Sequence, residues 1–485
     1  MREQVTDYFF YRKRYALGYF LLISTILIVY FVAFTFVPGE LRTGEVASTI
    51  KSASLSFSSI SPDMVVDIPY HVLQRFSINL FGVTTQSIKF PSLILGLLTS
   101  IGFFFLVRLW FRRNVAIFST ILAVTATQFI FIIQDGTPAI MYSFLAVWLL
   151  LSATMVTRQK IFATFWKVLV CVLMAALLYV PLGVYLVAAV LTTMLFHPHI
   201  RYIIRRLPAF KVVLATVLGL IVISPVLYAA FVDVDVAKSL LGIPTKPISL
   251  QDNLFVLFHA IFGFATNSSS YMLRPFFSLG AFLLIMVGAY KLFTQKHTAR
   301  SYIILVWGIL LLPLIILNPE HLSAYLIIGS MYMTLGIATL IADWYKLFPR
   351  NPYARIIGLA PLGIVVLGLV ASGILRYMNN YQYNTAVLSH YSKDLTLLNN
   401  ELSLLKNGSK ARLLVSSDEQ PFYSVVAKYN DKVGMSVDAV GSGDIIIMSH
   451  AANKNTPTKE MPTAILTDAR NEHADRFYIY KNTQN

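Results

Sequence analysis

The feature that most constrains this chain is a series of long apolar segments separated by short polar ones. Eleven of these segments come near the roughly 20 residues that an α-helix needs to cross a bilayer core. They lie at about 16–37, 93–111, 115–133, 139–157, 162–180, 182–196, 212–231, 276–293, 301–317, 322–342 and 356–375. Hydrophobic residues make up 56% of the 485 residues, more than a water-soluble chain can bury in its core. The sequence predicts a polytopic α-helical membrane protein with about 11 transmembrane helices.

Basic residues lie in every second loop, and this pattern predicts the orientation of the chain. Lys and Arg near the ends of membrane spans are retained in the cytoplasm. Such residues gather around positions 12–14, 108–113, 158–160, 201–211, 291–300 and 346–355, whereas the alternate loops hold most of the acid. We expect a cell-membrane protein with a cytoplasmic N-terminus and an extracytoplasmic C-terminus. The net charge of +16 is then largely a topology signal, and we expect no nucleic-acid partner.

The sequence changes character after the last apolar segment. We expect a transmembrane domain over residues 1–376 and a small extracytoplasmic α/β domain over 377–485. Apolar residues at spacings of three and four predict one amphipathic helix from Val387 to Leu405. Runs of β-branched and aromatic residues predict strands, which lie at 412–415, 445–448, 464–466 and 477–480.

The loop over residues 38–90, between the first two apolar segments, carries four carboxylates to the external face. They are Glu40, Glu45, Asp63 and Asp67. A carboxylate just outside a span can act as a general base or hold a cation. We therefore expect any chemistry to begin in this first external loop.

Several short motifs follow one another through the first loop and the spans after it. They read Gly44-Glu45, Ile68-Pro69-Tyr70, Leu80-Phe81-Gly82, Lys89-Phe90-Pro91-Ser92 and Gln134-Asp135-Gly136-Thr137. Their order and spacing resemble the GT-C superfamily of membrane glycosyltransferases, in the branch of dolichyl-phosphate-mannose protein mannosyltransferases and lipid A aminoarabinose transferases. The resemblance covers about residues 15–160 and extends to the later spans by topology.

The resemblance implies a GT-C-like fold and a glycosyltransferase activity. The expected partners are membrane lipids, a polyprenyl-phosphate sugar as donor, and an extracytoplasmic acceptor, which could be a protein, a lipid or a cell-envelope glycan. One carboxylate suffices to deprotonate the acceptor, and positive charge or hydrogen-bond donors must receive the leaving phosphate.

The resemblance also selects candidate site residues. Glu45 is the favoured general base, with Asp67 and Glu40 as further catalytic candidates. The residues expected to bind substrate are Asp135, Gln134, Tyr70, His71 and Arg75.

The chain departs from the family pattern at three positions. The usual Asp-Glu pair reads Gly44-Glu45, and two family arginines are replaced by Thr137 and Ala324. Arg42, Arg75 and Arg274 are the alternative sources of positive charge for the phosphate.

We predict no resident metal, because no spaced set of ligands accompanies His71 and His321. A divalent cation stays open as an alternative partner for the phosphate.

Two other classes of function compete with the enzyme. The missing aspartate and arginines leave open a non-catalytic GT-C relative that acts in envelope assembly. A lipid or glycan transporter would carry ionisable residues near the middle of its spans. Lys167 is the clear charge inside a predicted span, and it lies near the expected cytoplasmic end.

Overall fold

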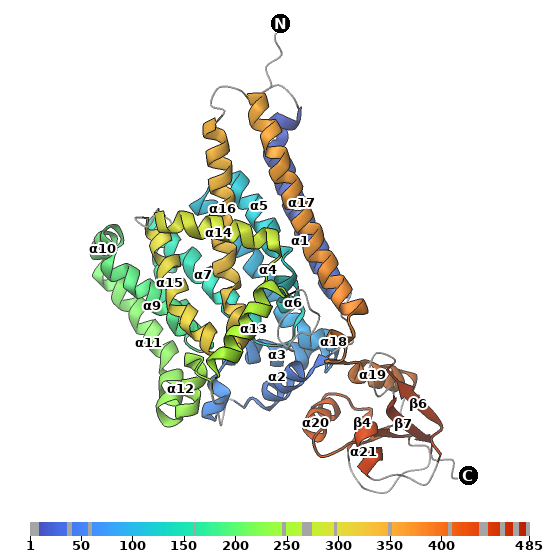
Figure 1. Ribbon diagram of the computed structural model, residues 1–485. Coiled ribbons are helices and arrows are strands. Elements are labelled where there is room, and N and C mark those ends of the chain that lie inside the picture. Colours follow the sequence, from blue (N-terminus) through green and yellow to red (C-terminus); the bar gives the residue numbers. More distant parts are fainter. Residues whose placement is uncertain are drawn as a thin grey trace.

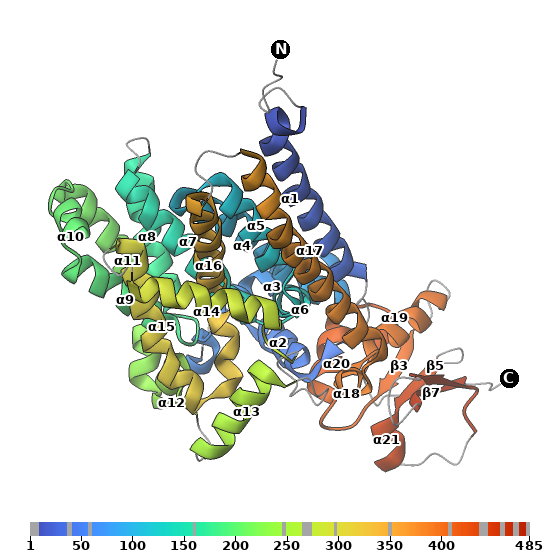
Figure 2. The ribbon, with the colours of Figure 1, turned by 45° about the horizontal axis from the view of Figure 1, so that its top comes forward.

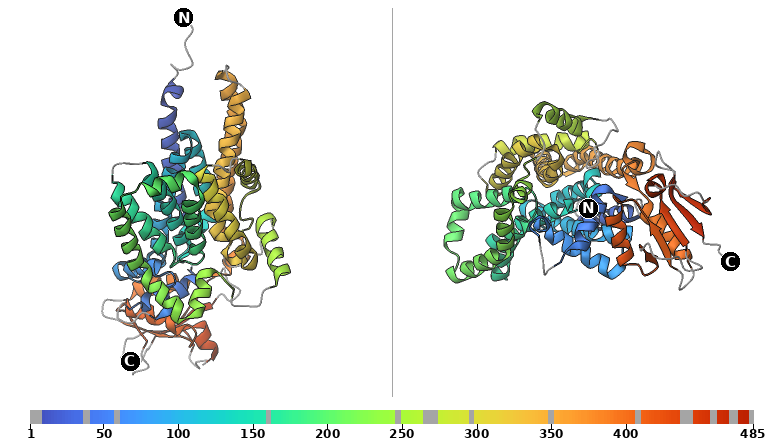
Figure 3. Two further views of the ribbon diagram at one scale, coloured as in Figure 1. Left: turned by 90° about the vertical axis from the view of Figure 1, so that its left-hand side faces the viewer. Right: turned by 90° about the horizontal axis from the view of Figure 1, so that it is seen from below.

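The computed structural model is a helical bundle with a small α/β region at one end (Figures 1 and 3). It describes residues 9–35, 41–56, 61–158, 162–244, 249–263, 274–294, 298–347, 352–405, 410–435, 445–455, 461–468 and 475–481. The predicted fold class, a helical membrane protein with a small C-terminal α/β region, is confirmed.

Within the described ranges, seven helices are individually long and apolar enough to cross a membrane. They belong to α1 (Phe9–Thr35), α4 (Thr85–Trp110), α7 (Ala139–Arg158), α11 (Ala209–Val232), α15 (Ala299–Leu317), α16 (Tyr325–Leu347) and α17 (Pro352–Tyr383).

Other apolar helices are bent or short. Two bent pairs also pass the length test: α5 (Arg113–Val124) with α6 (Thr127–Gln134), and α9 (Gly183–Phe196) with α10 (Pro198–Arg205). The shorter apolar helices are α8 (Ala163–Leu177), α13 (Leu250–Phe262) and α14 (Leu279–Thr294). All eleven predicted segments overlap helices, but helix length supports seven to nine spans, so the count of eleven stays a prediction.

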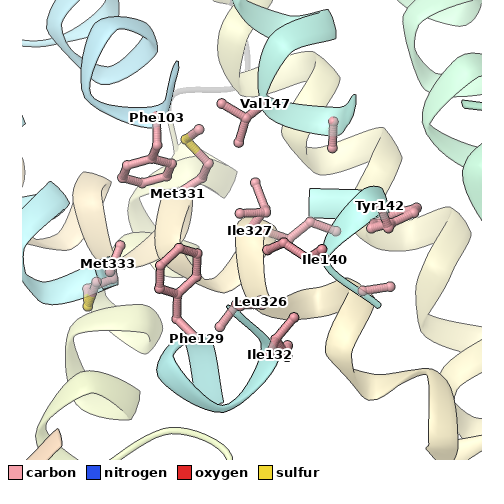
Figure 4. Close-up of a cluster of buried hydrophobic side chains, with 14 of the residues drawn as sticks. Phe103, Phe129, Ile132, Ile140, Tyr142, Val147, Leu326, Ile327, Met331 and Met333 are labelled. Atoms are coloured by element: carbon pink, nitrogen blue, oxygen red, sulfur yellow. The ribbon is translucent and has the colours of Figure 1, made fainter. Parts of the chain in front are cut away.

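The centre of the bundle is a dense apolar core. Side chains from α4, α6, α7 and α16 meet there, among them Phe103, Phe129, Val147 and Met331 (Figure 4). Each of these four side chains is at most 4% exposed, so this part of the bundle forms a rigid support for the loop between α1 and α4.

The first external loop folds into short helices. They are α2 (Thr43–Ser54), the 3₁₀ helix η2 (Pro62–Val65) and α3 (Ile68–Phe81). Helix α4 then begins at Thr85, although the predicted loop extends to residue 90. The early start has a local cause: the N–H of Ser87 donates to Thr84 Oγ1 at 3.1 Å, and the N–H of Thr84 donates to Ser87 Oγ at 3.0 Å. This reciprocal cap stabilises the polar first turn.

The C-terminal region contains a five-stranded sheet of order β4-β3-β5-β7-β6. Its strands are β3 (Ala411–Leu414), β4 (Val433–Gly434), β5 (Ile445–Ser449), β6 (Ala464–Thr467) and β7 (Asp475–Lys481). Strand β3 is parallel to β4 and β5, whereas β7 is antiparallel to β5 and β6. The four predicted strands are confirmed, and the helices α20 (Gln420–Lys428) and α21 (His450–Asn455) accompany them.

The single helix predicted from Val387 to Leu405 is wrong. The chain instead forms α18 (Thr385–Leu388), the short strand β2 (Tyr391–Ser392) and α19 (Asp394–Leu404). Strand β2 pairs antiparallel with β1 (Leu41–Arg42), so that Arg42 lies opposite Tyr391. This pairing with a distant segment interrupts a helical periodicity that is otherwise continuous.

The C-terminal region and the first external loop share one hydrophobic core. Ile78, Val83 and Ile88 from the loop and α4 pack in the same cluster as Leu398 and Phe477. Helix α20 lies beside α2 (Figure 2). Helix α17 continues without a break through residue 376, so the C-terminal region is held at both the last span and the first loop.

Candidate functional site

Glu45, in the first turn of α2, is surrounded by hydrogen-bond donors. Its Oε2 accepts from the N–H of Arg42 at 2.7 Å, and its Oε1 accepts from the N–H of Gly136 at 2.6 Å. The ammonium group of Lys89 lies 3.4 Å from Oε1. The side chain is fully buried; burial raises its pKa, and the positive charge of Lys89 opposes this rise. Glu45 thus ties α2 to α4 and to the turn after α6.

Gly136 permits this arrangement because a side chain there would not fit. A Cβ atom on Gly136 would lie 2.8 Å from Ile88 Cγ2 and 3.2 Å from Glu45 Oε1. The glycine therefore lets the backbone of the 134–138 turn approach Glu45 closely.

Arg42 and Asp135 form a buried ion pair beside Glu45. Asp135 also accepts a hydrogen bond from Thr137 Oγ1 at 2.7 Å. The guanidinium carbon of Arg42 lies 4.8 Å from the centre of the Phe131 ring and 5.9 Å from that of Tyr391. The orientation of Arg42 is fixed by the strand pairing of its backbone, by the two aromatic rings and by the carboxylate of Asp135.

Gln134 links this cluster to the last span. Its Oε1 accepts from Lys89 Nζ at 3.1 Å, and its side-chain amide donates to the hydroxyl of Tyr381 in α17. The hydroxyl groups of Tyr381 and Tyr391 lie 2.6 Å apart. A continuous polar network therefore runs from α4 through the 134–138 turn to the C-terminal region.

A cavity of about 470 Å³ opens beside this network. It is lined by Arg42, Thr43, Gly44, Asp67, Phe131, Ile132, Asp135, Thr137, Pro138, Ala139, Tyr142, Val180, Pro181, Leu182, Glu320, His321, Ser323, Ala324 and His390. Three of these residues are carboxylates: Asp67, Asp135 and Glu320. Glu45 is not among the lining residues, because its carboxylate points into the network beneath the cavity wall.

Asp67 has an unusual environment. Its backbone is left-handed, with a φ of 61°, and its N–H donates to the carbonyl of Tyr179 at 2.8 Å. Its Oδ1 is buried without a hydrogen-bond partner in the part of the chain that the structure describes. Burial raises the pKa of Asp67 to about 7, although Lys51 opposes the rise. Such a carboxylate titrates in the range of a general base that works at neutral pH.

The predicted substrate contacts in α3 do not line this cavity. His71 is buried and hydrogen-bonded to Ser52 at 2.8 Å, and burial lowers its pKa to about 3. The hydroxyl of Tyr70 lies 2.8 Å from that of Ser92. Arg75 is half-buried and also lies away from the lining. In this structure Tyr70 and His71 pack α3 against α2 and α4.

Several site residues differ in how well the sequence reveals them. The third catalytic candidate, Glu40, falls outside the described residues. Lys89 belongs to the Lys89-Phe90-Pro91-Ser92 motif. Its pairing with Glu45 is not predicted by the sequence, because it depends on where α4 lies relative to α2. His390 is a contribution of the C-terminal region that no motif indicates. Across the described residues, no group of three His, Cys, Asp or Glu side chains is close enough to hold a metal ion.

Comparisons with known proteins support the resemblance found in the sequence. Residues 68–228 match the family model described as dolichyl-phosphate-mannose-protein mannosyltransferase. No curated protein sequence matches the chain.

Solved structures are similar to this chain at low sequence identity. The oligosaccharyltransferase of Archaeoglobus fulgidus in the apo form matches with a TM-score of 0.51 and 11% identity, over 85% of this chain and 64% of that one. ArnT from Cupriavidus metallidurans in the apo state gives a TM-score of 0.48 and 14% identity, over 96% of this chain and 98% of that one. The same protein bound to undecaprenyl phosphate gives 0.49 and 13%, over 95% and 97%.

Proposed function

We propose that this chain is a membrane glycosyltransferase of the GT-C type, which transfers a sugar from a polyprenyl-phosphate donor to an extracytoplasmic acceptor, with Asp67 as general base. The match of residues 68–228 to the mannosyltransferase family model supports this proposal. The observation that carries this assignment is the cavity whose lining includes both Asp67 and Arg42. Glu45, favoured from the sequence, becomes a positioning residue in this proposal because two backbone amides and Lys89 occupy its carboxylate.

Arg42 and nearby apolar residues form the proposed place in the cavity for a phosphate carried on an apolar chain. Arg42 is the one Arg or Lys among its lining residues, and Asp135 and Phe131 hold its guanidinium in place. Ile132, Val180 and Leu182 provide apolar wall for the first part of a polyprenyl chain. The leaving phosphate would gain charge beside Arg42, where a fixed cation stabilises it most.

The proposed reaction is a single displacement. The acceptor oxygen or nitrogen attacks the anomeric carbon while Asp67 takes its proton. The bond between that carbon and the phosphate oxygen breaks, and the polyprenyl phosphate leaves with the electron pair. The Asp67 carboxyl group is suited to accept this proton, because its pKa is raised to about 7 and its Oδ1 has no hydrogen-bond partner among the described residues.

A neighbouring cleft is the proposed entry for the acceptor. It has a volume of about 510 Å³ and shares Thr43 and His390 with the cavity. Three carboxylates, Asp394, Asp418 and Glu419, line it together with aromatic side chains from α20. Arg476 is paired with Asp394 at 2.5 Å. Carboxylates that accept hydrogen bonds favour a sugar acceptor that carries hydroxyl or amino groups.

The test is the Asp67→Asn variant, assayed in membranes with radiolabelled polyprenyl-phosphate sugars, with mannose first because of the family match. We expect transfer to fall by about 10²- to 10⁴-fold, the usual contribution of a general base. Asp63→Asn is the matched control, since Asp63 is an exposed acid of the same loop. Unchanged transfer by a folded Asp67→Asn variant would remove Asp67 from this role.

The pH dependence of the transfer rate is a second test of Asp67 as general base. Asp67 must be ionised to act as base, and its pKa is raised to about 7. The transfer rate should therefore rise as the pH increases from 6 to 8 and should lose this dependence in Asp67→Asn. A wild-type rate that is flat over this range would contradict the assignment.

A second candidate function, a non-catalytic role in envelope assembly, is favoured by one observation. Gly44 lines the cavity at the position where family members usually carry the aspartate presumed to act as base. The absence of transfer with every polyprenyl-phosphate sugar, in a wild-type protein that still binds polyprenyl phosphate, would favour this alternative.

A further inference from the structure

A second cavity, of about 430 Å³, lies at the end of the bundle away from the candidate site. It reaches Arg158 at the C-terminal end of α7, whose N-terminal Ala139 lines the site cavity. It also reaches Arg300 at the start of α15, whose C-terminal end leads to Glu320. The two cavities therefore lie at opposite ends of α7 and α15.

Helix α10 closes one side of this second cavity and marks a membrane surface. It is bent by 83° from α9. Its Ile200, Ile203 and Ile204 line the cavity, while Arg201 and Arg205 are exposed. A short helix with one apolar and one basic face, turned nearly at right angles to a span, is typical of an element that lies in the lipid interface.

The remaining walls combine an apolar surface with positive charge. Leu150, Val170 and Ile303 contribute from three helices. Arg158 and Arg300 lie close enough to repel each other, and no carboxylate is among the lining residues. Arg300 is fixed there: it donates to the carbonyl of Trp110, and its guanidinium carbon lies 4.6 Å from the centre of the Phe111 ring.

We propose that this cavity binds an anionic phospholipid, with the headgroup phosphate between Arg158 and Arg300 and an acyl chain along the apolar wall. The two arginines favour an anion, because no carboxylate among the lining residues neutralises them. The apolar walls favour an anion that carries a hydrocarbon chain. Basic pockets between helices at the cytoplasmic face bind anionic headgroups in this way. The basic loops predict that this end of the bundle is cytoplasmic.

The experiment measures lipid retention by the purified full-length chain in a neutral detergent. Native mass spectrometry would count adducts of dioleoyl phosphatidylglycerol, dioleoyl phosphatidylcholine and glycerol phosphate, and thermal unfolding would report stabilisation. We expect phosphatidylglycerol to be retained preferentially and to raise Tm, and glycerol phosphate to do neither. Equal retention of both phospholipids, or binding of glycerol phosphate alone, would overturn the proposal.

Variants locate the binding. Arg158→Gln should weaken phosphatidylglycerol retention by about fivefold, the contribution of one basic residue near an anionic lipid. Ala153→Phe, which fills the apolar wall without changing charge, should displace both phospholipids alike. Arg201→Gln is the matched control, because it removes the same charge from the same face outside the cavity. A loss in this control as large as in Arg158→Gln would show general surface attraction and reject the site.

Discussion

At the scale of single residues, Gly44 leaves space in the wall of the site cavity. A Cβ atom there would meet Thr137 Cγ2 at 3.7 Å, which is an ordinary van der Waals contact. A Cβ atom at this position therefore displaces none of its described neighbours. A carboxylate introduced at Gly44 would enter the same cavity as that of Asp67.

We expect Gly44→Asp to restore part of the transfer that Asp67→Asn loses. The double variant should exceed Asp67→Asn alone by about tenfold or more in the membrane assay, since even an imperfectly placed base contributes. Gly44→Asn in the same background is the control of equal size. Equal rates for the Asp and Asn versions would mean that the position does not reach the acceptor.

Glu45 should act on stability more than on chemistry. Glu45→Gln leaves Lys89 buried without its counter-charge, and breaking a buried ion pair costs on the order of 3 kcal/mol. We expect a lower Tm and a loss of transfer that follows the loss of folded protein. Adding Lys89→Gln should recover part of the stability in a double-mutant cycle. Abolished transfer in a Glu45→Gln protein of wild-type Tm would restore Glu45 as the base.

At the scale of elements, the C-terminal region and the first loop behave as one packed unit. Leu398 of α19 is fully buried in their shared core, while Leu404 of the same helix is 78% exposed. A substitution that destabilises the C-terminal side of this core should therefore also destabilise the first loop.

The Leu398→Ala variant tests this coupling. We expect a loss of about 2–5 kcal/mol in the free energy of unfolding, the usual cost of removing a buried leucine side chain. Hydrogen exchange should accelerate in α2 and α3 as well as in α19. Leu404→Ala should change neither quantity, and exchange confined to α19 in Leu398→Ala would argue against a shared core.

The helices and strands also show which parts of the fold can be predicted from the sequence. Long runs of apolar residues identify every predicted span as helical, because a helix that crosses a bilayer needs such a run within one segment of the sequence. The same runs of apolar residues do not predict the strand β2 or the early start of α4. A two-residue strand has no period of its own, and the Thr84–Ser87 cap is polar where the apolar run has not begun. In the site, Asp67 and Asp135 both line one cavity, whereas the burial of Glu45 depends on contacts between segments far apart in sequence.

At the scale of the whole molecule, the site cavity and the proposed lipid cavity lie at opposite ends of the bundle and differ in character. The one beside the C-terminal region is rich in acids, and the other is apolar and basic. The basic loops predict that the acidic end is extracytoplasmic.

Cysteine labelling in intact cells tests this orientation. With Cys171 replaced by Ala, Leu404→Cys should react with a membrane-impermeant maleimide, because Leu404 is exposed in the C-terminal region. Arg201→Cys, at the other end of the bundle, should react only after the membrane is permeabilised. The reverse pattern would invert the topology and place the candidate site in the cytoplasm.

The pairing of β1 with β2 has a consequence for the order of biosynthesis. Arg42 leaves the ribosome early, but its strand partner and aromatic neighbour Tyr391 follows the last span. The wall of the site that contains Arg42 therefore stays incomplete until nearly the whole chain has been made and inserted. A chain released before residue 391 would keep Asp135 and Phe131 but would lack the strand partner of Arg42, so we expect such truncated products to insert in the membrane without activity.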